Sequence, residues 1–445
     1  MSAHNHISAP PESFREKLKW LGPGFLWMVS AAGSGELLFT PRVGSLYGYT
    51  LLWAMLIAVM LKWFINREIG RYTVCTGKTL MEGFSMLSGP SRWALYLIVV
   101  PQLFVAVTSI AGLAGSAATS LVLVLPGSVK IWTIVSICLS TALVVWGRFK
   151  AVEKVAMILA IGLGVAAIIA AVSVFPEGKE LLNGLRPSMP SDVKQEEVLP
   201  WLGFMLSGAA GLIWYSYWIK EKGYGLRQER RSAEIKTLSE RDIKSLKGWV
   251  RQMTTDCTVA VVGTLVITLS FLILGAELLK PKGLVPEENK VAETLGTILG
   301  QLWGPVGFWF MITAVFVGFW DTVLSDQDGF GRMFSQSTQL LFKNTKGNRK
   351  WLTDKVLTKV FVIGLLTVAP VILFLSMGEP VKLLKIAGAI EASHIPIVVV
   401  LVLYLNHKNL PGDLMPSKFS FVLTAAAGLF FAAFAAVYLA ELVSR

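Results

Sequence analysis

The strongest constraint in this sequence is a series of apolar segments, each about 20 residues long, that recurs between residues 23 and 442. A helix of ~20 apolar residues is long enough to cross the ~30 Å hydrocarbon core of a bilayer. Only 16% of the residues are charged and the mean hydropathy is +0.60, whereas soluble domains have about a quarter of their residues charged. The sequence therefore predicts an all-α integral membrane protein.

Eleven transmembrane helices are expected, in one transmembrane domain over residues 1–445. The predicted spans are residues 22–45, 47–67, 93–121, 130–147, 151–175, 200–219, 253–278, 302–324, 354–376, 381–405 and 419–442. Residues 1–19 are polar and lack the short apolar core of a signal peptide. Cys75, Cys138 and Cys257 have no paired spacing, which favours apolar fillers of helices over a disulfide or a metal site.

Positive charge is concentrated in alternate loops, and the formal net charge is +12. The basic segments are residues 15–19, 68–92, 148–154, 220–251 and 332–359. The loops between them, 176–199 and 277–298, are rich in glutamate. Because cytoplasmic loops of membrane proteins are enriched in lysine and arginine, we expect a cytoplasmic N-terminus and, with an odd number of spans, an external C-terminus. The expected location is the cell inner (plasma) membrane. The charge is thus explained by the lipid bilayer, and no nucleic-acid partner is expected.

Two spans contain glycines at their middles. An interrupted helix survives in a membrane only where it lines a cavity, and a matched pair of broken helices is typical of inverted-repeat transporters with a midplane site. Close helix packing through small residues is the alternative explanation. The matched pair predicts a substrate site made of Gly33, Ser34, Gly35 and Glu36 in the first span and Gly208, Ala209, Ala210 and Gly211 in the sixth.

Several motifs, strongest in the first third of the chain, are similar to those of a known transporter family. They are Gly22-Pro23-Gly24-Phe25-Leu26, Gly48-Tyr49, Leu51-Leu52-Trp53, Arg71, Thr76-Gly77-Lys78, Gly115-Ser116-Ala117, Phe149 with Glu153, and Pro396. In these positions the chain resembles the NRAMP (natural resistance-associated macrophage protein) family of metal-ion transporters. The resemblance implies the leucine-transporter fold, with two inverted five-helix repeats (about 22–175 and 200–405) and one extra helix (419–442).

The chain departs from that family at the residues that would bind metal. The family's D-P-G-N turn aligns with residues 33–36, so that glycine replaces the metal-binding aspartate, and its M-P-H stretch aligns with residues 209–211. The acidic pair of span 3 becomes Ser109 and Gly112, and a glutamine of span 10 becomes Gly388. The resemblance therefore implies a retained scaffold with a replaced ligand set.

Two substrates fit this altered site. The leading hypothesis is a carrier of a small anion, bicarbonate, bound to backbone N–H groups at the broken helix ends. Glu36 would then handle a coupling cation, H⁺ or Na⁺. The alternative is a divalent metal cation, Mg²⁺ or Mn²⁺, since Mg²⁺ accepts a partly hydrated site with one or two carboxylates. No cofactor and no resident metal are expected.

Further ionisable residues lie within predicted spans, where such groups usually face a cavity or a partner. Asp256, Asp321 and His394 join Glu36 as coupling candidates, with pairing inside the bundle as the alternative. Glu391 lies one turn before His394 and could relay protons to it. Lys62 is expected to extend to the inner interface, and Arg42 to the outer one.

Other functional classes are less consistent with the sequence. An enzyme would need a nucleophile with its base, or a metal-ligand cluster, and the sequence contains no HExxH, GxSxG or histidine pair. Broken helices also line channels, but two inverted halves favour alternating access. We therefore expect a secondary transporter and no enzymatic activity.

Overall fold

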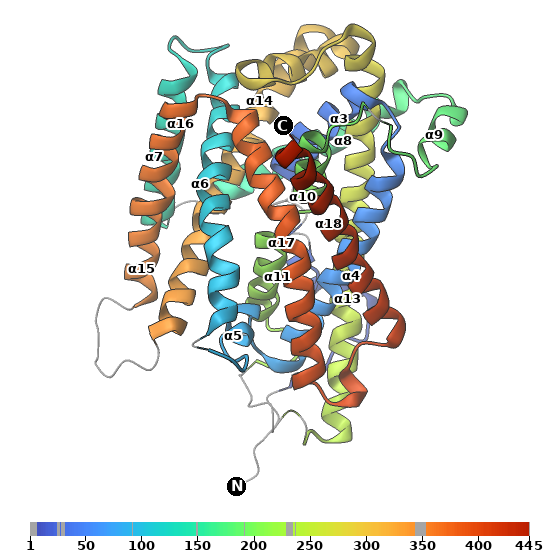
Figure 1. Ribbon diagram of the computed structural model, residues 1–445, viewed down its shortest axis with the longest axis vertical. Coiled ribbons are helices and arrows are strands. Elements are labelled where there is room, and N and C mark those ends of the chain that lie inside the picture. Colours follow the sequence, from blue (N-terminus) through green and yellow to red (C-terminus); the bar gives the residue numbers. More distant parts are fainter. Residues whose placement is uncertain are drawn as a thin grey trace.

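The computed structural model describes residues 7–24, 27, 32–90, 92–147, 150–190, 192–227, 235, 237–342 and 353–444. In these residues all regular elements are helices, and one isolated bridge pairs Ile7 with Leu226. Most of the long helices run along the long axis of the molecule, and the two termini lie at opposite ends (Figure 1). The predicted all-α membrane fold is confirmed.

The long elements match the predicted spans. They are α4 (Leu52–Thr76), α6 (Trp93–Leu121), α7 (Val129–Trp146), α8 (Lys150–Ser173), α10 (Gln195–Phe204) with α11 (Ala209–Lys222), α13 (Glu240–Leu274), α14 (Val291–Phe342), α15 (Asp354–Val360) with η6 (Phe361–Val368) and α16 (Ala369–Met377), α17 (Pro380–Asn409) and α18 (Lys418–Ser444). Shorter elements are α1 (Phe14–Lys19), η1 (Ala32–Phe39), α3 (Thr40–Tyr47), α5 (Leu80–Phe84), α9 (Gly178–Gly184), η2 (Gly275–Leu279), η3 (Lys280–Lys282), η4 (Glu288–Lys290) and η7 (Gly412–Leu414). Within the described ranges, nine helices are long and apolar enough to cross a membrane. The interrupted first span and α4 complete the eleven.

Two helices extend well beyond their predicted spans. Helix α13 begins at Glu240, where the Ser239 side chain accepts a hydrogen bond from the Asp242 N–H. Helix α14 continues to Phe342 and is kinked at Gly304, whose φ is 62° and which precedes Pro305. Hydropathy marks only the part of a helix that lies in hydrocarbon, so polar extensions into water escape it.

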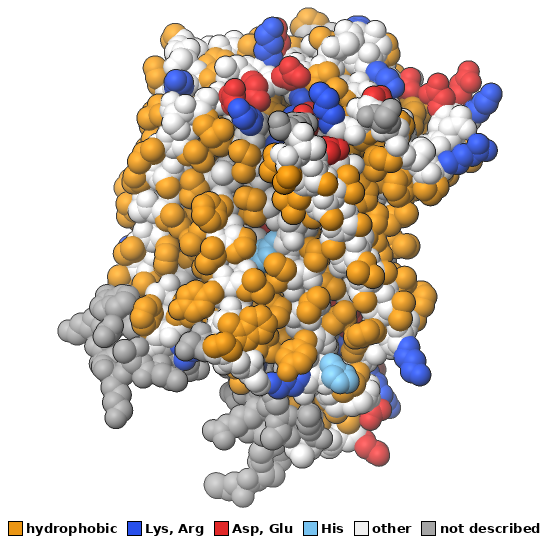
Figure 2. Space-filling view, viewed as in Figure 1, with side chains coloured by type: hydrophobic (Ala, Val, Ile, Leu, Met, Phe, Trp, Pro, Cys, Tyr) orange, Lys and Arg blue, Asp and Glu red, His pale blue; other side chains and the backbone are white. Residues whose placement is uncertain are grey.

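Apolar side chains cover the middle of the molecular surface. Figure 2 shows them over the central zone of the visible face, with most charged side chains near its top and bottom. Phe104, Ile158 and Leu429 are 62%, 65% and 72% exposed, respectively. Soluble monomers rarely expose apolar surface on this scale, and we assign this zone to lipid contact.

Helices α10 and α17 approach each other closely at the centre of the molecule. A Cβ atom on Gly203 would lie 2.2 Å from the Gly388 carbonyl oxygen, and one on Gly388 would lie 2.8 Å from Pro200. Only glycine fits at either position without displacing backbone. Gly388 thus allows two helices to touch, and Glu391 follows it by one turn of α17.

Candidate ion-binding site

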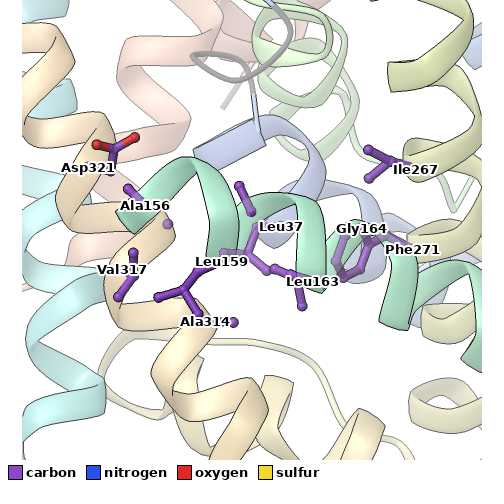
Figure 3. Close-up of a pocket in the computed structure, with 12 residues that line it drawn as sticks. Leu37, Ala156, Leu159, Leu163, Gly164, Ile267, Phe271, Ala314, Val317 and Asp321 are labelled. Carbon is purple, nitrogen blue, oxygen red and sulfur yellow. The ribbon is translucent and has the colours of Figure 1, made fainter. Parts of the chain in front are cut away.

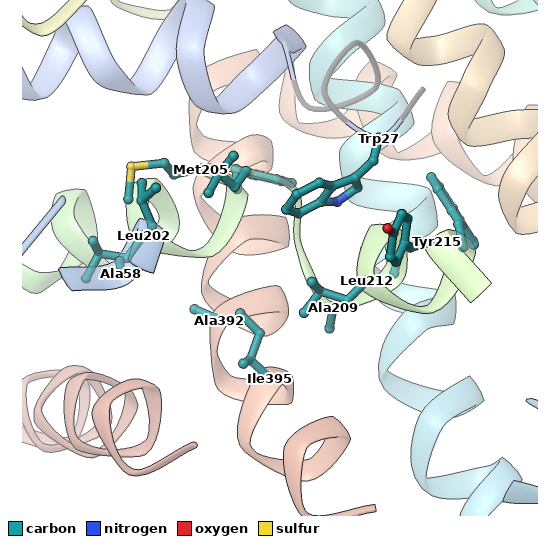
Figure 4. Close-up of a cluster of buried hydrophobic side chains, with 14 of the residues drawn as sticks. Trp27, Ala58, Leu202, Met205, Ala209, Leu212, Tyr215, Ala392 and Ile395 are labelled. Atoms are coloured by element: carbon teal, nitrogen blue, oxygen red, sulfur yellow. The ribbon is translucent and has the colours of Figure 1, made fainter. Parts of the chain in front are cut away.

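The sixth span is broken between α10 and α11. Leu206 and Ser207 have φ values of 56° and 76°, a left-handed conformation that is uncommon for residues other than glycine. Such conformations persist where the surroundings enforce them, and they cluster at functional sites. Figure 4 shows the two half-helices with Met205 and Ala209 on either side of the gap. The predicted break is present but lies at residues 205–208, earlier than expected, and Gly211 is helical.

The first span is also irregular at the predicted place. Residues 32–39 form the π-helix η1, and α3 continues from Thr40. The expectation that residues 33–35 are unwound is wrong, since their backbone is π-helical, a geometry that is rare and frequent at functional sites. Residues 28–31, the surroundings of Gly33 and the side chain of Ser34 lie outside the described part of the chain.

The irregular segments of spans 1 and 6 face each other, as the sequence predicts. Glu36 is buried, and its Oε1 accepts a hydrogen bond from the Leu206 N–H at 3.0 Å. Trp201 Nε1 donates to Thr40 Oγ1 at 3.0 Å. A Cβ atom on Gly35 would lie 2.9 Å from the Phe204 carbonyl oxygen, so glycine is needed for this approach. Glu36 therefore bridges the two segments.

A small cavity with both polar and apolar walls opens beside the start of α11. Its volume is about 40 Å³. Span 6 lines it with Ser207, Gly208, Ala210, Gly211 and Trp214, and other helices contribute Ser109, Asp326 and Glu391. Three predicted site residues, Gly208, Ala210 and Gly211, are thus brought together there. Ala209 and Glu36 are not among the residues that line it.

Two buried carboxylates face this cavity, and neither is among the substrate-binding residues predicted from the sequence. The Glu391 side chain accepts hydrogen bonds from the Ala210 N–H at 3.2 Å and from Gln102 Nε2 at 3.1 Å. A Cβ atom on Gly208 would lie 2.5 Å from the Glu391 carboxyl carbon. Asp326 accepts a hydrogen bond from Ser109 Oγ at 2.8 Å. Within the described residues, no three His, Cys, Asp or Glu side chains converge as metal ligands.

The coupling candidates Asp321 and Asp256 lie elsewhere. Asp321 lies at the edge of a separate cavity lined mainly by apolar side chains such as Leu163 and Phe271 (Figure 3). Five helical residues separate it from Asp326, a rotation of about 140° around the helix axis. Asp256 accepts hydrogen bonds from the N–H groups of Gly22 and Gly24 at 2.9 and 2.6 Å. It therefore anchors the start of the first span.

His394 is linked to Glu391 through a residue that the sequence analysis missed. Gln102 Nε2 lies 2.9 Å from His394 Nδ1 and also donates to Glu391. All three side chains are buried. The signal that could have identified Gln102 is an amide in the middle of an otherwise apolar span. Gln102, from α6, therefore links the cavity residue Glu391 to His394 one turn further along α17.

The prediction for Lys62 is wrong, whereas Arg42 contacts both segments that are predicted to be external loops, through Glu197 and Glu287. Lys62 is completely buried, and its ammonium donates to three backbone carbonyls that the break leaves without helical partners. Arg42 makes a bidentate ion pair with Glu197 at 2.8 and 2.9 Å. Glu197 also pairs with Lys385. This buried cluster joins α3, α10 and α17 on the side of the break where α10 begins.

Comparison with known proteins agrees with this architecture. The sequence model of the natural resistance-associated macrophage protein-like (Nramp) family matches residues 24–441. An uncharacterized protein of Pasteurella multocida is 22% identical over 349 residues, which span 76% of this chain and 75% of that protein. The divalent metal cation transporter MntH of Brucella suis is 24% identical over 313 residues, or 68% and 64% of the two chains.

A solved structure shares the fold. A mutant form of the manganese transporter of Eremococcus coleocola superimposes with a TM-score of 0.70 at 15% identity, over 98% of this chain and 90% of that one. The match covers nearly the whole membrane domain and so includes both irregular spans. The chain belongs to the natural resistance-associated macrophage protein-like family of multi-pass secondary transporters.

Proposed function

We propose that this protein transports a hard divalent cation, Mg²⁺ in preference to Mn²⁺, by alternating access. The observation that carries the proposal is the pair of buried carboxylates, Asp326 and Glu391, that face one cavity at the broken span. With Glu36 they make three carboxylates against the single ammonium of Lys62. When all are ionised, the break has a net charge of two negative, which one divalent cation balances.

The ligand chemistry favours a hard ion. The cavity offers carboxylate and hydroxyl oxygens from Asp326, Glu391, Ser109 and Ser207, and no sulfur. Carboxylate, carbonyl and water ligands suit Mg²⁺ and Mn²⁺, and Mg²⁺ usually keeps several waters while binding one or two carboxylates. At roughly 10–15 Å³ per water, the cavity admits an ion with a few waters. The names of the Brucella suis and Eremococcus coleocola relatives support a divalent metal as the substrate class.

Bicarbonate, the leading substrate in the sequence analysis, becomes the second candidate. None of the relatives described above supports it, and two N–H groups that it would need are occupied: Leu206 donates to Glu36 and Ala210 to Glu391. One observation favours it, namely that Gly208, Ala210 and Gly211 line the cavity at the N-terminal end of α11. An anion would require both cavity carboxylates to be protonated.

We propose H⁺ as the coupling ion. Glu36 Oε2 has no hydrogen-bond partner among the described residues, so it can accept a proton without breaking the bond from Leu206 to Oε1. Glu391 and His394, both hydrogen-bonded to the Gln102 amide, offer two further proton-accepting groups. We also propose the inner (plasma) membrane as the location, with a cytoplasmic N-terminus, from the charge of the loops.

Uptake into proteoliposomes tests the substrate. Liposomes with a trapped Mg²⁺-sensitive or Mn²⁺-sensitive dye, and parallel liposomes given radiolabelled bicarbonate, are exposed to imposed H⁺ and Na⁺ gradients. We expect saturable Mg²⁺ uptake driven by the H⁺ gradient. Asp326→Asn and Glu391→Gln should reduce it at least tenfold, while the matched control Asp321→Asn, on the same helix, should retain it. Bicarbonate uptake without Mg²⁺ uptake would establish the second candidate instead.

A further inference from the structure

The ammonium of Lys62 lies in a cradle of backbone oxygens. Its Nζ donates to the carbonyls of Gly203, Met205 and Ser207 at 2.8, 2.5 and 2.8 Å. An ammonium group has three N–H donors, and each has a partner here. The ring of Phe431, from the extra helix α18, lies 5.4 Å from Nζ, a distance at which a cation and an aromatic face attract.

The carbonyls in this cradle belong to the end of α10 and to the unwound segment after it. The last carbonyls of a helix have no partner within the helix and form the negative end of its dipole. In transporters with broken spans, such carbonyls are where a coupling cation binds. In this protein the cation is supplied by the chain, from the middle of α4.

Two carboxylates lie close enough to interact electrostatically with this ammonium: Glu36 from η1 and Glu391 from α17. The carbonyl distances of 2.5–2.8 Å suit an ammonium-sized cation, and they exceed the 2.0–2.1 Å, approximately, that Mg²⁺ requires. The cradle is therefore distinct in size from a Mg²⁺ site, and of its three residues only Ser207 also lines the cavity of Asp326 and Glu391.

We infer that Lys62 is a tethered cation that permanently fills a monovalent-cation site at the broken sixth span. Two consequences follow. The natural protein needs no Na⁺ or K⁺ at this position, since the site is occupied. Removal of the Lys62 ammonium leaves three converging carbonyls in a buried space, which a free monovalent cation of similar size, NH₄⁺ or K⁺, then binds.

Thermal unfolding of the full-length protein tests the inference. The first variant is Lys62→Ala, which vacates the cradle. The matched control is Lys408→Ala, which removes an ammonium in the last turn of α17 that donates to Ser88 Oγ. Each is unfolded in choline chloride, NH₄Cl, KCl and NaCl at equal ionic strength. We expect Lys62→Ala to have a lowered Tm in choline that rises saturably, by about 2–4 °C, with NH₄⁺ or K⁺. The parent and Lys408→Ala should show no such difference.

Transport by the parent provides a second test that does not depend on the variant folding. We expect the rates of Mg²⁺ uptake by the parent in NaCl, KCl and choline chloride to agree within about a factor of two. Stimulation of the parent by Na⁺ or K⁺ would overturn the inference, as would a folded Lys62→Ala variant that is indifferent to NH₄⁺ and K⁺. The unfolding readout does not depend on which substrate is carried, so failure of the Mg²⁺ proposal would leave that test intact.

Discussion

The two oxygens of the Glu36 carboxylate have different surroundings. Oε1 accepts the Leu206 N–H and lies 3.5 Å from Thr268 Oγ1, whereas Oε2 is buried with no hydrogen-bond partner among the described residues. A buried polar atom without a partner is costly, and it persists most readily where a proton or an ion visits. The side chain thus combines a structural bond with a free acceptor.

Replacement of Glu36 by glutamine separates these two functions. The amide oxygen of Glu36→Gln can still accept the Leu206 N–H, so we expect a Tm within a few degrees of the parent. The variant has no acidic proton to exchange, and its uptake should no longer respond to an imposed H⁺ gradient. Proteoliposome uptake with and without the gradient measures this. An unchanged gradient response would exclude Glu36 as the coupling group.

Gly208 is required by its neighbour rather than by its backbone. Its φ of −81° suits any residue, but an added Cβ atom would lie 2.5 Å from the Glu391 carboxyl carbon. Gly208→Ala should displace Glu391, reduce uptake at least tenfold, and cost about 1–3 kcal/mol of stability through overpacking. Gly162→Ala is the control, because its Cβ would meet nothing within 4 Å. Equal uptake by the two variants would contradict the assigned position of Glu391.

Among the elements, α3, α10 and α17 are joined by the cluster of Arg42, Glu197 and Lys385. The Arg42 and Glu197 side chains are 5% and 7% exposed, so their charges are poorly solvated and depend on each other. Because each of the three residues comes from a different helix, the cluster holds the helices together where α10 begins. We interpret it as the closed side of the transporter.

Breaking that cluster should both destabilise and open the protein. Glu197→Gln removes the buried carboxylate that Arg42 and the partly exposed Lys385 share, and leaves Arg42 only the exposed Glu287 at 3.7 Å. Breaking a buried pair costs about 3–5 kcal/mol. We expect a lower Tm and faster modification of a cysteine placed at Ser207 by a membrane-impermeant thiol reagent added from the side of the C-terminus. The same cysteine in the parent background is the reference. Equal modification rates would mean that the cluster does not gate access.

At the scale of the whole molecule, the arrangement of the termini is open to a direct test. They lie at opposite ends of the bundle (Figure 1), and the loop charges predict that the N-terminus is cytoplasmic. A reporter that is active only outside the cytoplasm should therefore be active when fused after residue 445 and inactive when fused before residue 1. The reverse result would invert the proposed orientation.

The local sequence determined the secondary structure and the fold class. Helix α6 has the predicted bounds, because a long, mainly apolar segment must satisfy its backbone hydrogen bonds internally in a membrane. Glycines in the middle of spans 1 and 6 indicated that these two spans are irregular. They did not mark the exact break, since the left-handed residues Leu206 and Ser207 are not glycines, and their conformation is enforced by contacts with Glu36 and Lys62.

Only the tertiary structure decided which charged groups meet. Gln102 and Glu391 are separated by 289 residues, Ser109 and Asp326 by 217, and Lys62 and Gly203 by 141. In a bilayer, apolar periodicity does not identify the lipid-facing side of a helix as clearly as it identifies the wet side of a soluble helix, because both faces of a span are apolar. Lys62 therefore resembled an interfacial residue in the sequence, and Asp326 lay beyond the predicted span 302–324, which includes Asp321. Helix packing determined that Lys62 fills the carbonyl cradle and that Asp326 faces Glu391 across the cavity.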